Sequence, residues 1–457
     1  MQPILANQLL QGVGSLSENP AISAVVTDSR AAQAGSLFVC IKGERVDGHD
    51  FAAKAIAQGA AGIVAQHAVD GVPPEKTVLV SDVLDALIAM GGNYRDGFSP
   101  CLVGVTGSVG KTTTKEFCHA VFSAFGKTLK TEGNANNEIG MPQTLFRLDE
   151  SVHYAVIEMG MQGLGEIRKL TEAAKPAGGI ITCIGVSHLE QLGTRENIRT
   201  AKLEICDGMP EGAPLVLNGD DALLCKAQLP PHVVPVYFAI ENKNADITAH
   251  EITGGPADTY FTICDKKFGV RKAYIPTMGL HNVRDALSAY ALATRMGLDA
   301  NVAAKALSDY KTTGHRQNMV VHQGVTVIED CYNASPDSMR AALETLAAYP
   351  AAGRRVAVLG DMFELGSLTA AAHTEVGELA AKHSVNLLLT VGEAMRYAHK
   401  RAEMLGVPCT HCADKNDALV LLKNYCRTGD VVLVKASHGM AFETILEDFY
   451  ADKEGNV

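Results

Sequence analysis

The stretch best suited to chemistry is a glycine-rich turn at residues 104–113 that leads into a lysine and two threonines. It follows an apolar segment expected to be a strand, 101–105, and it opens a helix near Lys111. Glycines let backbone N–H groups approach phosphate oxygens, the helix N-terminus favours negative charge, and a lysine adds a cation. The Thr112 hydroxyl can reach a bound Mg²⁺. The predicted phosphate-binding residues are Gly107, Ser108, Val109, Gly110, Lys111, Thr112 and Thr113.

This turn is a variant of the usual phosphate-binding loop. The strict pattern has a glycine five residues before Gly110, where this chain has Val105, while Gly104 and Gly107 stand at other offsets. The alternative is a glycine-rich strand-to-helix turn without a ligand. The Gly-Lys-Thr-Thr run and the flanking strand and helix favour the phosphate-binding interpretation.

Two polar residues are expected at the same edge of the sheet as this loop. Glu158 lies at the end of an apolar strand expected at 154–159, and His188 follows a second strand expected at 179–186. Ligands of open parallel sheets bind beyond the carboxyl ends of the strands. Glu158 is therefore a candidate Mg²⁺ ligand, with a solvated carboxylate as the alternative. His188 is by type more often a capping or packing residue, and only its place at this edge makes it a candidate.

Other residues leave their roles open. Lys202 lies in a segment expected to be helical, 196–206, where a lysine is normally a solvated charge. Cys409 and Cys412 have CxxC spacing, but one such pair is a weak sign of zinc, and ordinary thiols are preferred. His49 either orients a substrate or caps a turn. Asp361, like Glu364, is either a site residue or a residue that fixes a turn.

The elements expected around these residues form an α/β protein of three domains. A small N-terminal α/β domain is expected at 1–98, a central P-loop mononucleotide-binding domain with a mainly parallel sheet at 99–312, and a C-terminal Rossmann-like α/β domain at 313–457. The predicted strands outside the loop region are 24–28, 36–41, 62–65, 325–330, 355–360, 386–391 and 430–435, with antiparallel strands at 246–275 and helices at 51–58 and 280–295.

Composition limits the partners. The chain has 457 residues, a hydrophobic fraction of 47% and a net charge of −11 with no basic stretch, so a nucleic-acid partner is not expected. No run of about 18 apolar residues predicts a membrane span, and no export signal is seen. The eleven cysteines are scattered without a dense framework, which suits a reducing compartment and predicts a cytoplasmic protein.

Taken together, these motifs resemble the Mur ligase family, cytoplasmic enzymes that extend the peptide of the peptidoglycan precursor, and within it the branch that adds D-alanyl-D-alanine. The likeness covers nearly the whole chain, and the phosphate loop matches the family's own version. Departures are Leu203, Asp285, Glu329 and Ala436, where the family commonly has Gly, Asn, Asp and Gly. The matching segments start with Thr27, Gly35, Asp47, Thr131, Gly279, Gly314, Glu329, Leu359 and Gly429.

The resemblance implies a carboxylate–amine ligase that uses ATP and Mg²⁺. Its substrates would be UDP-N-acetylmuramoyl-tripeptide and D-Ala-D-Ala, joined through an acyl phosphate, and the protein is expected to be a monomer. Lys202 matches the family lysine that becomes carbamylated. The implied catalytic residues are Lys111, Glu158, His188 and Lys202, with Thr112, Glu158, His188 and Lys202 at the metal. Further ATP contacts are implied for Asn282, Arg316, Asp330 and Asn333, and substrate contacts for Ser29, Arg30, Asp47, His49, Asn134, Asn136, Asn137 and Asp361.

The sequence also admits two other functions. One is a sibling ligase that adds a different amino acid, of the Mur or folylpolyglutamate type. The segments 361–366 and 133–140 argue against it. The other is a P-loop NTPase switch or assembly ATPase, which the whole-chain pattern and the Lys202 segment oppose. The third residue of the acceptor peptide is expected to be lysine or diaminopimelate.

Overall fold

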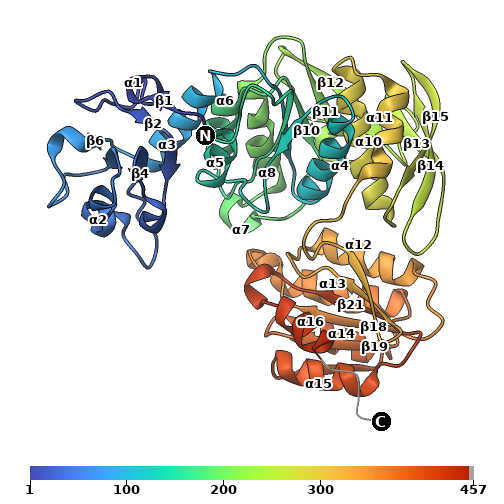
Figure 1. Ribbon diagram of the computed structural model, residues 1–457. Helices are drawn as coiled ribbons and strands as arrows, with labels where there is room; N and C mark the ends of the chain where they lie inside the picture. Colours follow the sequence, from blue (N-terminus) through green and yellow to red (C-terminus); the bar gives the residue numbers. More distant parts are fainter. Residues whose placement is uncertain (452–457) are drawn as a thin grey trace.

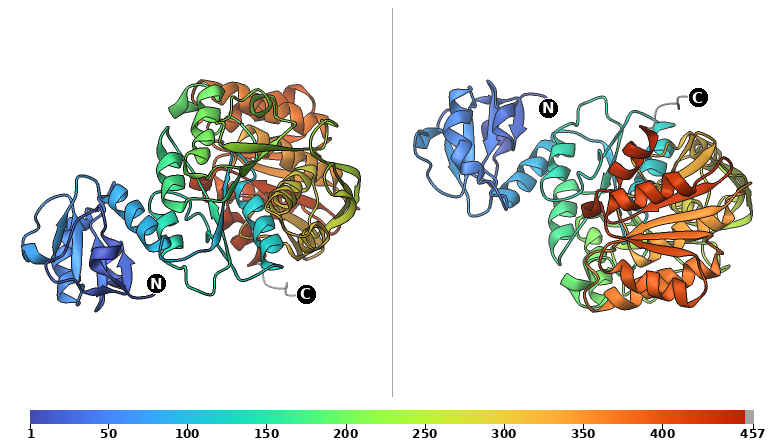
Figure 2. Two further views of the ribbon diagram at one scale, coloured as in Figure 1. Left: turned by 90° about the horizontal axis from the view of Figure 1, so that it is seen from above. Right: turned by 90° about the horizontal axis from the view of Figure 1, so that it is seen from below.

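The computed structural model describes residues 1–451, which form three α/β domains in chain order (Figure 1). The central domain lies between the other two, and the N-terminal domain is set apart from the C-terminal one in every view (Figure 2). The predicted fold class is confirmed. The predicted boundaries at 98/99 and 312/313 fall between the sheets, and as exact limits they stay predictions.

The N-terminal domain contains a parallel four-stranded sheet in the order β3-β4-β5-β6 and an antiparallel pair, β1-β2. Its last helix, α3, packs against α5 and α6 of the central domain. Tyr94 of α3 donates to the Leu148 carbonyl at 3.0 Å, so this helix joins the two domains. The elements are β1 Ile4–Leu5, α1 Ala6–Leu9, β2 Ala21–Ile22, β3 Ala24–Val26, β4 Ser36–Val39, α2 Ala52–Ala57, β5 Gly62–Ala65, β6 Thr77–Leu79 and α3 Val83–Arg95.

The central domain is built on nine strands in the order β15-β14-β13-β12-β11-β10-β7-β9-β8. The strands from β8 to β13 pair in parallel, and β13-β14-β15 pair antiparallel. One face packs on α4, α10 and α11, and the other on α3, α5, α6 and α8. The strands are β7 Cys101–Thr106, β8 Thr128–Lys130, β9 Tyr154–Glu158, β10 Gly178–Ile181, β11 Ala213–Asn218, β12 Val233–Ala239, β13 Ile247–Gly254, β14 Thr259–Asp265 and β15 Gly269–Ile275. The helices are α4 Lys111–Ser123, α5 Gly140–Leu145, α6 Glu166–Ala174, α7 Leu189–Leu192, α8 Arg195–Leu203, α9 Ala222–Cys225, α10 Leu280–Arg295 and α11 Ala300–Ala306.

The C-terminal domain has six strands in the order β16-β17-β21-β18-β19-β20, all parallel except the β16-β17 pair. Helices α12, α13 and α14 cover one face, and α15 and α16 the other. The elements are β16 Asn318–His322, β17 Val325–Glu329, α12 Pro336–Ala348, β18 Arg355–Gly360, α13 Thr369–Lys382, β19 Leu387–Val391, α14 Met395–Met404, β20 Cys409–Cys412, α15 Lys415–Tyr425, β21 Val431–Lys435 and α16 Glu443–Tyr450.

The strand predicted at 179–186 is shorter than expected. β10 ends at Ile181 because the next residues bond to the phosphate-loop region instead of continuing the ladder. Thr182 donates its hydroxyl to the Val109 carbonyl, and the Cys183 carbonyl accepts the Ser108 N–H at 3.0 Å. The segment after β10 therefore forms one wall of the loop.

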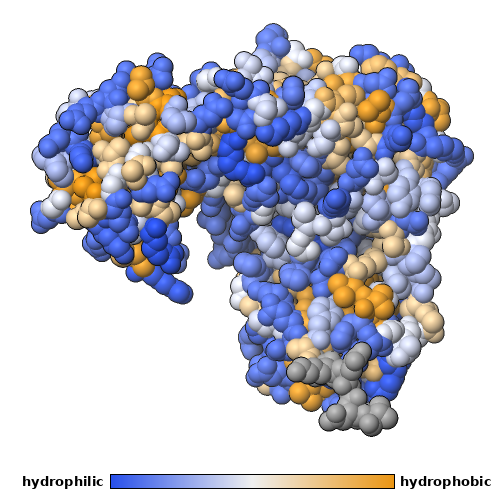
Figure 3. All heavy atoms as spheres, in the orientation of Figure 1, coloured by the Kyte–Doolittle hydropathy of each residue, from blue (hydrophilic) through white to orange (hydrophobic). Residues whose placement is uncertain are grey.

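The space-filling view shows an open notch under the central domain, between the N-terminal and C-terminal domains (Figure 3). The wall that the central domain presents to this notch is mainly hydrophilic. Among the described residues, no helix is long and apolar enough to cross a bilayer.

Candidate active site

The phosphate loop joins β7 to α4, as predicted. Gly107 and Gly110 have φ values of 150° and 87°, a region that L-residues with side chains rarely adopt. Lys111 donates its Nζ to the Gly107 carbonyl at 2.9 Å, so its side chain folds back over the loop. Ser108 Oγ is buried and has no hydrogen-bond partner among the described residues. A curled backbone, a lysine above it and an unpaired hydroxyl are suited to hold phosphate oxygens.

Glu158 lies directly beside this loop at the end of β9. Its carboxylate is 1% exposed and accepts the Thr112 hydroxyl at 3.0 Å and the Asn136 amide at 2.7 Å. Its own N–H donates to Thr131 Oγ1 at 3.0 Å, which fixes the strand end. The structure therefore brings together the threonine and the carboxylate that the sequence predicted for a metal, and it adds Asn136.

Lys115 and Glu116, on the second turn of α4, belong to this site and were missed from sequence. Lys115 Nζ lies 3.6 Å from Glu158 Oε2 and 3.4 Å from Glu116 Oε1, and its side chain is 1% exposed. Glu116 also pairs with Lys130 of β8. Buried charges need partners, and here two lysines and two carboxylates neutralise one another. The only sequence signal was their helical spacing from Lys111 and Thr112, which put them on the buried side of α4.

Three basic side chains, Lys111, His188 and Lys202, lie close enough for their charges to interact. Burial, together with the nearby charges of Lys111 and Lys202, lowers the pKa of His188 to about 4. The pKa of Lys202 is held well below its usual range by burial and by Lys111. Lys202 is 2% exposed, and its amine makes no hydrogen bond with the described residues. The prior expectation of a solvated helix lysine is therefore wrong for Lys202.

The side chains of this site supply only some of the ligands that a magnesium ion needs. The Glu158 carboxylate and Thr112 hydroxyl are the oxygen donors that Mg²⁺ prefers, and they already lie at hydrogen-bond distance. Within residues 1–451, no group of three or more His, Cys, Asp and Glu side chains is arranged to hold a metal. A complete shell would therefore need oxygens from a nucleotide, from water or from a modified side chain.

The predicted nucleotide contacts of the last domain cluster near its junction with the central domain. Asp330, at the end of β17, accepts Lys435 Nζ at 2.7 Å, and this lysine also bonds the Asn333 carbonyl at 2.9 Å. Asn282, on α10, donates to the Met278 carbonyl at 2.7 Å. The guanidinium of Arg316 is close enough to Lys111 to lower the pKa of that lysine, which burial already lowers. The charge of Arg316 therefore acts on the lysine of the phosphate loop.

A second contact between these domains involves His188 and Glu364. Glu364 Oε2 lies 2.8 Å from His188 Nδ1, at ion-pair distance but outside hydrogen-bond geometry. Both residues have positive φ, 64° and 61°, which is uncommon for non-glycine residues. Burial and the charge of Glu190 raise the pKa of Glu364. The C-terminal domain thus brings a carboxylate to the predicted catalytic histidine.

The predicted substrate residues of the first domain lie far from the loop. Asp47 accepts His49 Nδ1 at 2.6 Å, and His49 Nε2 accepts the Gln66 N–H at 3.1 Å, so both ring nitrogens have partners. The exposed guanidinium of Arg30 donates to the Asp28 carboxylate, with Nη2 2.7 Å from Oδ2. Ser29, between them in the chain, is buried. A substrate would contact the exposed guanidinium more readily than the His49 ring.

Three further residues were predicted to contact substrate. Two of them accept hydrogen bonds from backbone N–H groups, and the third is exposed. Asn137 accepts the Gly140 N–H at 2.9 Å and so begins α5. Asp361 accepts the Met395 N–H at 2.8 Å and so caps α14. Asn134 lies exposed on the segment that leads to Asn136. Substrate contacts by these residues stay predictions.

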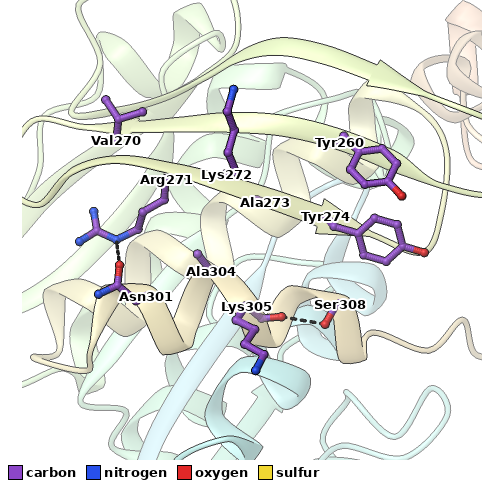
Figure 4. A pocket seen from close by; sticks show the side chains of 10 residues that line it. All are labelled: Tyr260, Val270, Arg271, Lys272, Ala273, Tyr274, Asn301, Ala304, Lys305 and Ser308. Atoms are coloured by element: carbon purple, nitrogen blue, oxygen red, sulfur yellow. Dashed lines mark hydrogen bonds between the residues drawn. The ribbon is translucent and has the colours of Figure 1, made fainter.

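A surface pocket of about 610 Å³ lies elsewhere, at the β15 edge of the nine-stranded sheet (Figure 4). Tyr260, Tyr274 and Lys272 line it from the sheet, and Arg271 donates there to Asn301 at 3.0 Å. None of the predicted site residues lines this pocket. Cys409 and Cys412 likewise form no joint site, because they pack into cores on opposite faces of the C-terminal sheet.

Three family models match consecutive parts of the chain: the catalytic domain model of the Mur ligase family at residues 21–90, the Mur ligase middle domain at 105–293, and the glutamate ligase domain at 315–438. The chain is 37% identical to the UDP-N-acetylmuramoyl-tripeptide–D-alanyl-D-alanine ligase of Bacillus subtilis, over 94% of each chain. It is 34% identical to the ligase of that name from Escherichia coli, over 93% of each.

Solved structures agree over the whole length. A crystal structure of MurF from Acinetobacter baumannii is 29% identical with a TM-score of 0.90, covering 98% of this chain and 99% of that one. MurF ligase from Thermotoga maritima in complex with ADP is 28% identical with a TM-score of 0.84, covering 93% and 97%. Because three models of this family match consecutive parts of the chain and its relatives match over nearly their whole length, this chain belongs to the Mur ligase family.

Proposed function

We propose that this protein is the ATP-dependent ligase that joins D-alanyl-D-alanine to UDP-N-acetylmuramoyl-tripeptide during synthesis of the peptidoglycan precursor. The observation that carries this proposal is the edge of the central sheet, where Glu158 accepts Thr112 of the phosphate loop and the buried Lys202 lies near Lys111. The chain is also 37% identical to a ligase of that name. Such an edge can gather a triphosphate, a divalent cation and a carboxylate.

The reaction follows from the chemistry of amide formation. A terminal carboxylate oxygen of the tripeptide attacks the γ-phosphorus of ATP, the bond to the bridging oxygen breaks, and ADP leaves. The amine of D-Ala-D-Ala then attacks the carbonyl of the acyl phosphate, loses a proton, and expels phosphate. No protein nucleophile is needed, so catalysis depends on positioning and charge neutralisation.

The residues of the edge divide these tasks. The backbone of the loop and Lys111 hold the phosphates and neutralise the transferring phosphoryl group. Thr112, Glu158, His188 and modified Lys202 would hold Mg²⁺, which supplies further charge neutralisation when bound. Asn136 and Lys115 keep the Glu158 carboxylate in place.

Carbamylation of Lys202 is part of this proposal. Burial and the charge of Lys111 lower the pKa of Lys202 and so favour its free amine, which is the form that adds CO₂. The addition forms an N–C bond and releases one proton, so the residue becomes an anion. That anion would remove the repulsion between Lys202 and Lys111 and provide an oxygen ligand.

The three domains take the remaining roles in this proposal. The first holds the UDP-sugar near Ser29 and Arg30, and the last covers ATP with Asn282, Arg316, Asp330 and Asn333 and receives the dipeptide. The substrates are soluble small molecules, so we place the enzyme in the cytoplasm, acting as a monomer.

One assay tests the proposal. Purified protein is incubated with Mg-ATP, D-Ala-D-Ala and UDP-N-acetylmuramoyl-tripeptide carrying either lysine or diaminopimelate, and the product is measured by mass spectrometry. We expect the pentapeptide product, ADP formation only when both acceptor and amine are present, and no product from Lys111→Ala. Lys127→Ala, which removes an exposed lysine paired with Asp149, is the matched control and should stay active. ATP turnover without acceptor and amine would instead indicate an NTPase switch.

The carbamate has its own test. Lys202→Ala should lose ligation and regain part of it when short carboxylic acids are added, because these can occupy the space of the carbamate. Wild-type activity in the unrescued variant would exclude a carbamate role.

A further inference from the structure

Two arginines of the C-terminal region stack on tyrosine rings, and they differ in one respect. The Arg316 guanidinium lies 3.9 Å from the centre of the Tyr332 ring, and that of Arg354 lies 4.0 Å from the Tyr425 ring. Arg354 donates its N–H groups to Asp430 Oδ2 at 2.7 Å and to the Tyr425 carbonyl at 2.6 Å. Arg316 donates to no acceptor among the described residues, although it is half-buried.

We propose that Tyr332 is a positioning residue that holds Arg316 flat against its ring so that the free N–H edge meets the phosphate chain of the nucleotide. A stacked guanidinium keeps its charge and all five donors in the plane of the fork, and that plane matches a phosphate. The inference rests on the proposed function, since it takes a nucleotide phosphate as the missing acceptor.

The location of the stack supports this acceptor. Arg316 lies on the segment that joins the central and C-terminal domains, close enough to Lys111 for the two charges to interact. The carboxylate that acts on Lys111 is Glu158, which already pairs with Lys115, so an added anion would further neutralise Lys111 and Arg316. The phosphate loop under Lys111 is the place where such an anion binds.

The tyrosine itself is held from two sides. Its N–H donates to the His315 carbonyl at 3.3 Å, which ties it to the residue before Arg316. Its ring also stacks with His438, with centroids 5.4 Å apart and an interplanar angle of 29°. Arg316 is thus ordered before the nucleotide arrives, and a pre-ordered side chain loses less entropy on binding.

The test is a double-mutant cycle read by ADP binding in a calorimeter. We expect Tyr332→Leu and Tyr332→Met to weaken ADP binding about tenfold, and Tyr332→Phe, which keeps the ring face, to stay within about twofold of wild type. Arg316→Ala should weaken binding at least as much as Tyr332→Leu. Because Tyr332 acts through Arg316, the double variant should bind ADP no more weakly than Arg316→Ala alone.

Tyr425→Leu is the matched control, since it removes the same kind of stack from an arginine whose donors are already used. It should leave ADP affinity unchanged. Additive losses in the double variant would mean that Tyr332 touches the nucleotide itself, and normal ADP affinity in folded Tyr332→Leu or Tyr332→Met would mean that it positions nothing; either result overturns the inference. The proposed function fails separately, if wild-type protein makes no pentapeptide product.

Discussion

The buried carboxylate of Glu158 is held in one orientation by its neighbouring side chains. Thr112 and Asn136 donate to it, and Lys115 lies at ion-pair distance. Hydrogen bonds to a charged group contribute more than neutral ones, and leaving such a group unsatisfied is costly. The orientation of Glu158 therefore depends on side chains from α4 and from the segment after β8.

Replacing Asn136 by alanine tests that dependence. The variant leaves one Glu158 oxygen without its 2.7 Å donor. A charged hydrogen bond contributes about 1.5–3 kcal/mol, so we expect ligation at low Mg²⁺ to fall by about tenfold or more, with partial recovery as Mg²⁺ is raised.

The measurement is initial rate against Mg²⁺ concentration. Asn93→Ala is the control, because Asn93 also donates its amide, but to the Leu9 and Gln11 carbonyls of the first domain. An identical Mg²⁺ dependence in both variants would show that Asn136 does not support the metal carboxylate.

At the scale of elements, the phosphate loop depends on its two neighbours, the segment after β10 and helix α10. A Cβ at Gly107 would lie 1.8 Å from Thr182 Oγ1, and a Cβ at Gly110 would lie 2.6 Å from Asp285 Oδ1. Both glycines have positive φ. The loop is therefore shaped by close packing as well as by its own backbone.

Gly107→Ala should disable the loop. The methyl group would push apart the loop and the segment after β10, and displacements of about 1 Å at a reacting centre can reduce the rate about 10²-fold. ADP affinity and ligation rate measure the effect.

Gly212→Ala separates this clash from backbone strain. Gly212 also has positive φ, 80°, but nothing lies within 4 Å of its added Cβ. The Gly212→Ala variant should lose about 1 kcal/mol of folding stability and keep its ligase activity. Equal losses of activity in the two variants would contradict the packing argument.

Asp285, on α10, gives the loop a pH-dependent neighbour. Burial raises the pKa of this carboxyl to about 8, whereas it is near 3.8 in an unfolded chain. Between these values the folded state holds the proton and the unfolded state does not, so the residue lowers stability as pH rises from about 4 to 8.

Asp285→Asn keeps the shape and removes the charge. Each unit of pKa difference corresponds to about 1.4 kcal/mol, so the variant should raise the melting temperature by several degrees at pH 8.5 and little at pH 5. Thermal unfolding at both values measures this. A gain that does not depend on pH would mean that the Asp285 carboxyl is not protonated in the fold.

The sequence predicted elements well where periodicity is strong and poorly where a contact between distant segments decides. Helix Leu280–Arg295 and strand Arg355–Gly360 have the predicted limits. The strand predicted at 179–186 ends early because its second half bonds to the loop. Lys202 and Lys115 resemble surface lysines in sequence, and their burial follows only from packing around the sheet.

At the scale of the whole molecule, the reacting groups begin in different domains. The predicted sugar-nucleotide residues lie in the first domain, on the far side of the notch from the C-terminal domain (Figures 1 and 3). The central and last domains already touch, through the pair of His188 and Glu364 and through Val186, which packs on the C-terminal core. Joining an acyl phosphate to an amine requires the first domain to approach as well.

We therefore expect the molecule to contract when all substrates are bound. The radius of gyration from X-ray scattering should fall toward about 23 Å, the value for a compact body of this length, with UDP-N-acetylmuramoyl-tripeptide, D-Ala-D-Ala and a non-hydrolysable ATP analogue together. Each ligand alone should cause a smaller change, because closure excludes water only when the site is full. Lys111→Ala, with its phosphate contact removed, should contract less at the same concentrations. Full activity with an unchanged radius in every ligand state would show that the open notch is already the working arrangement.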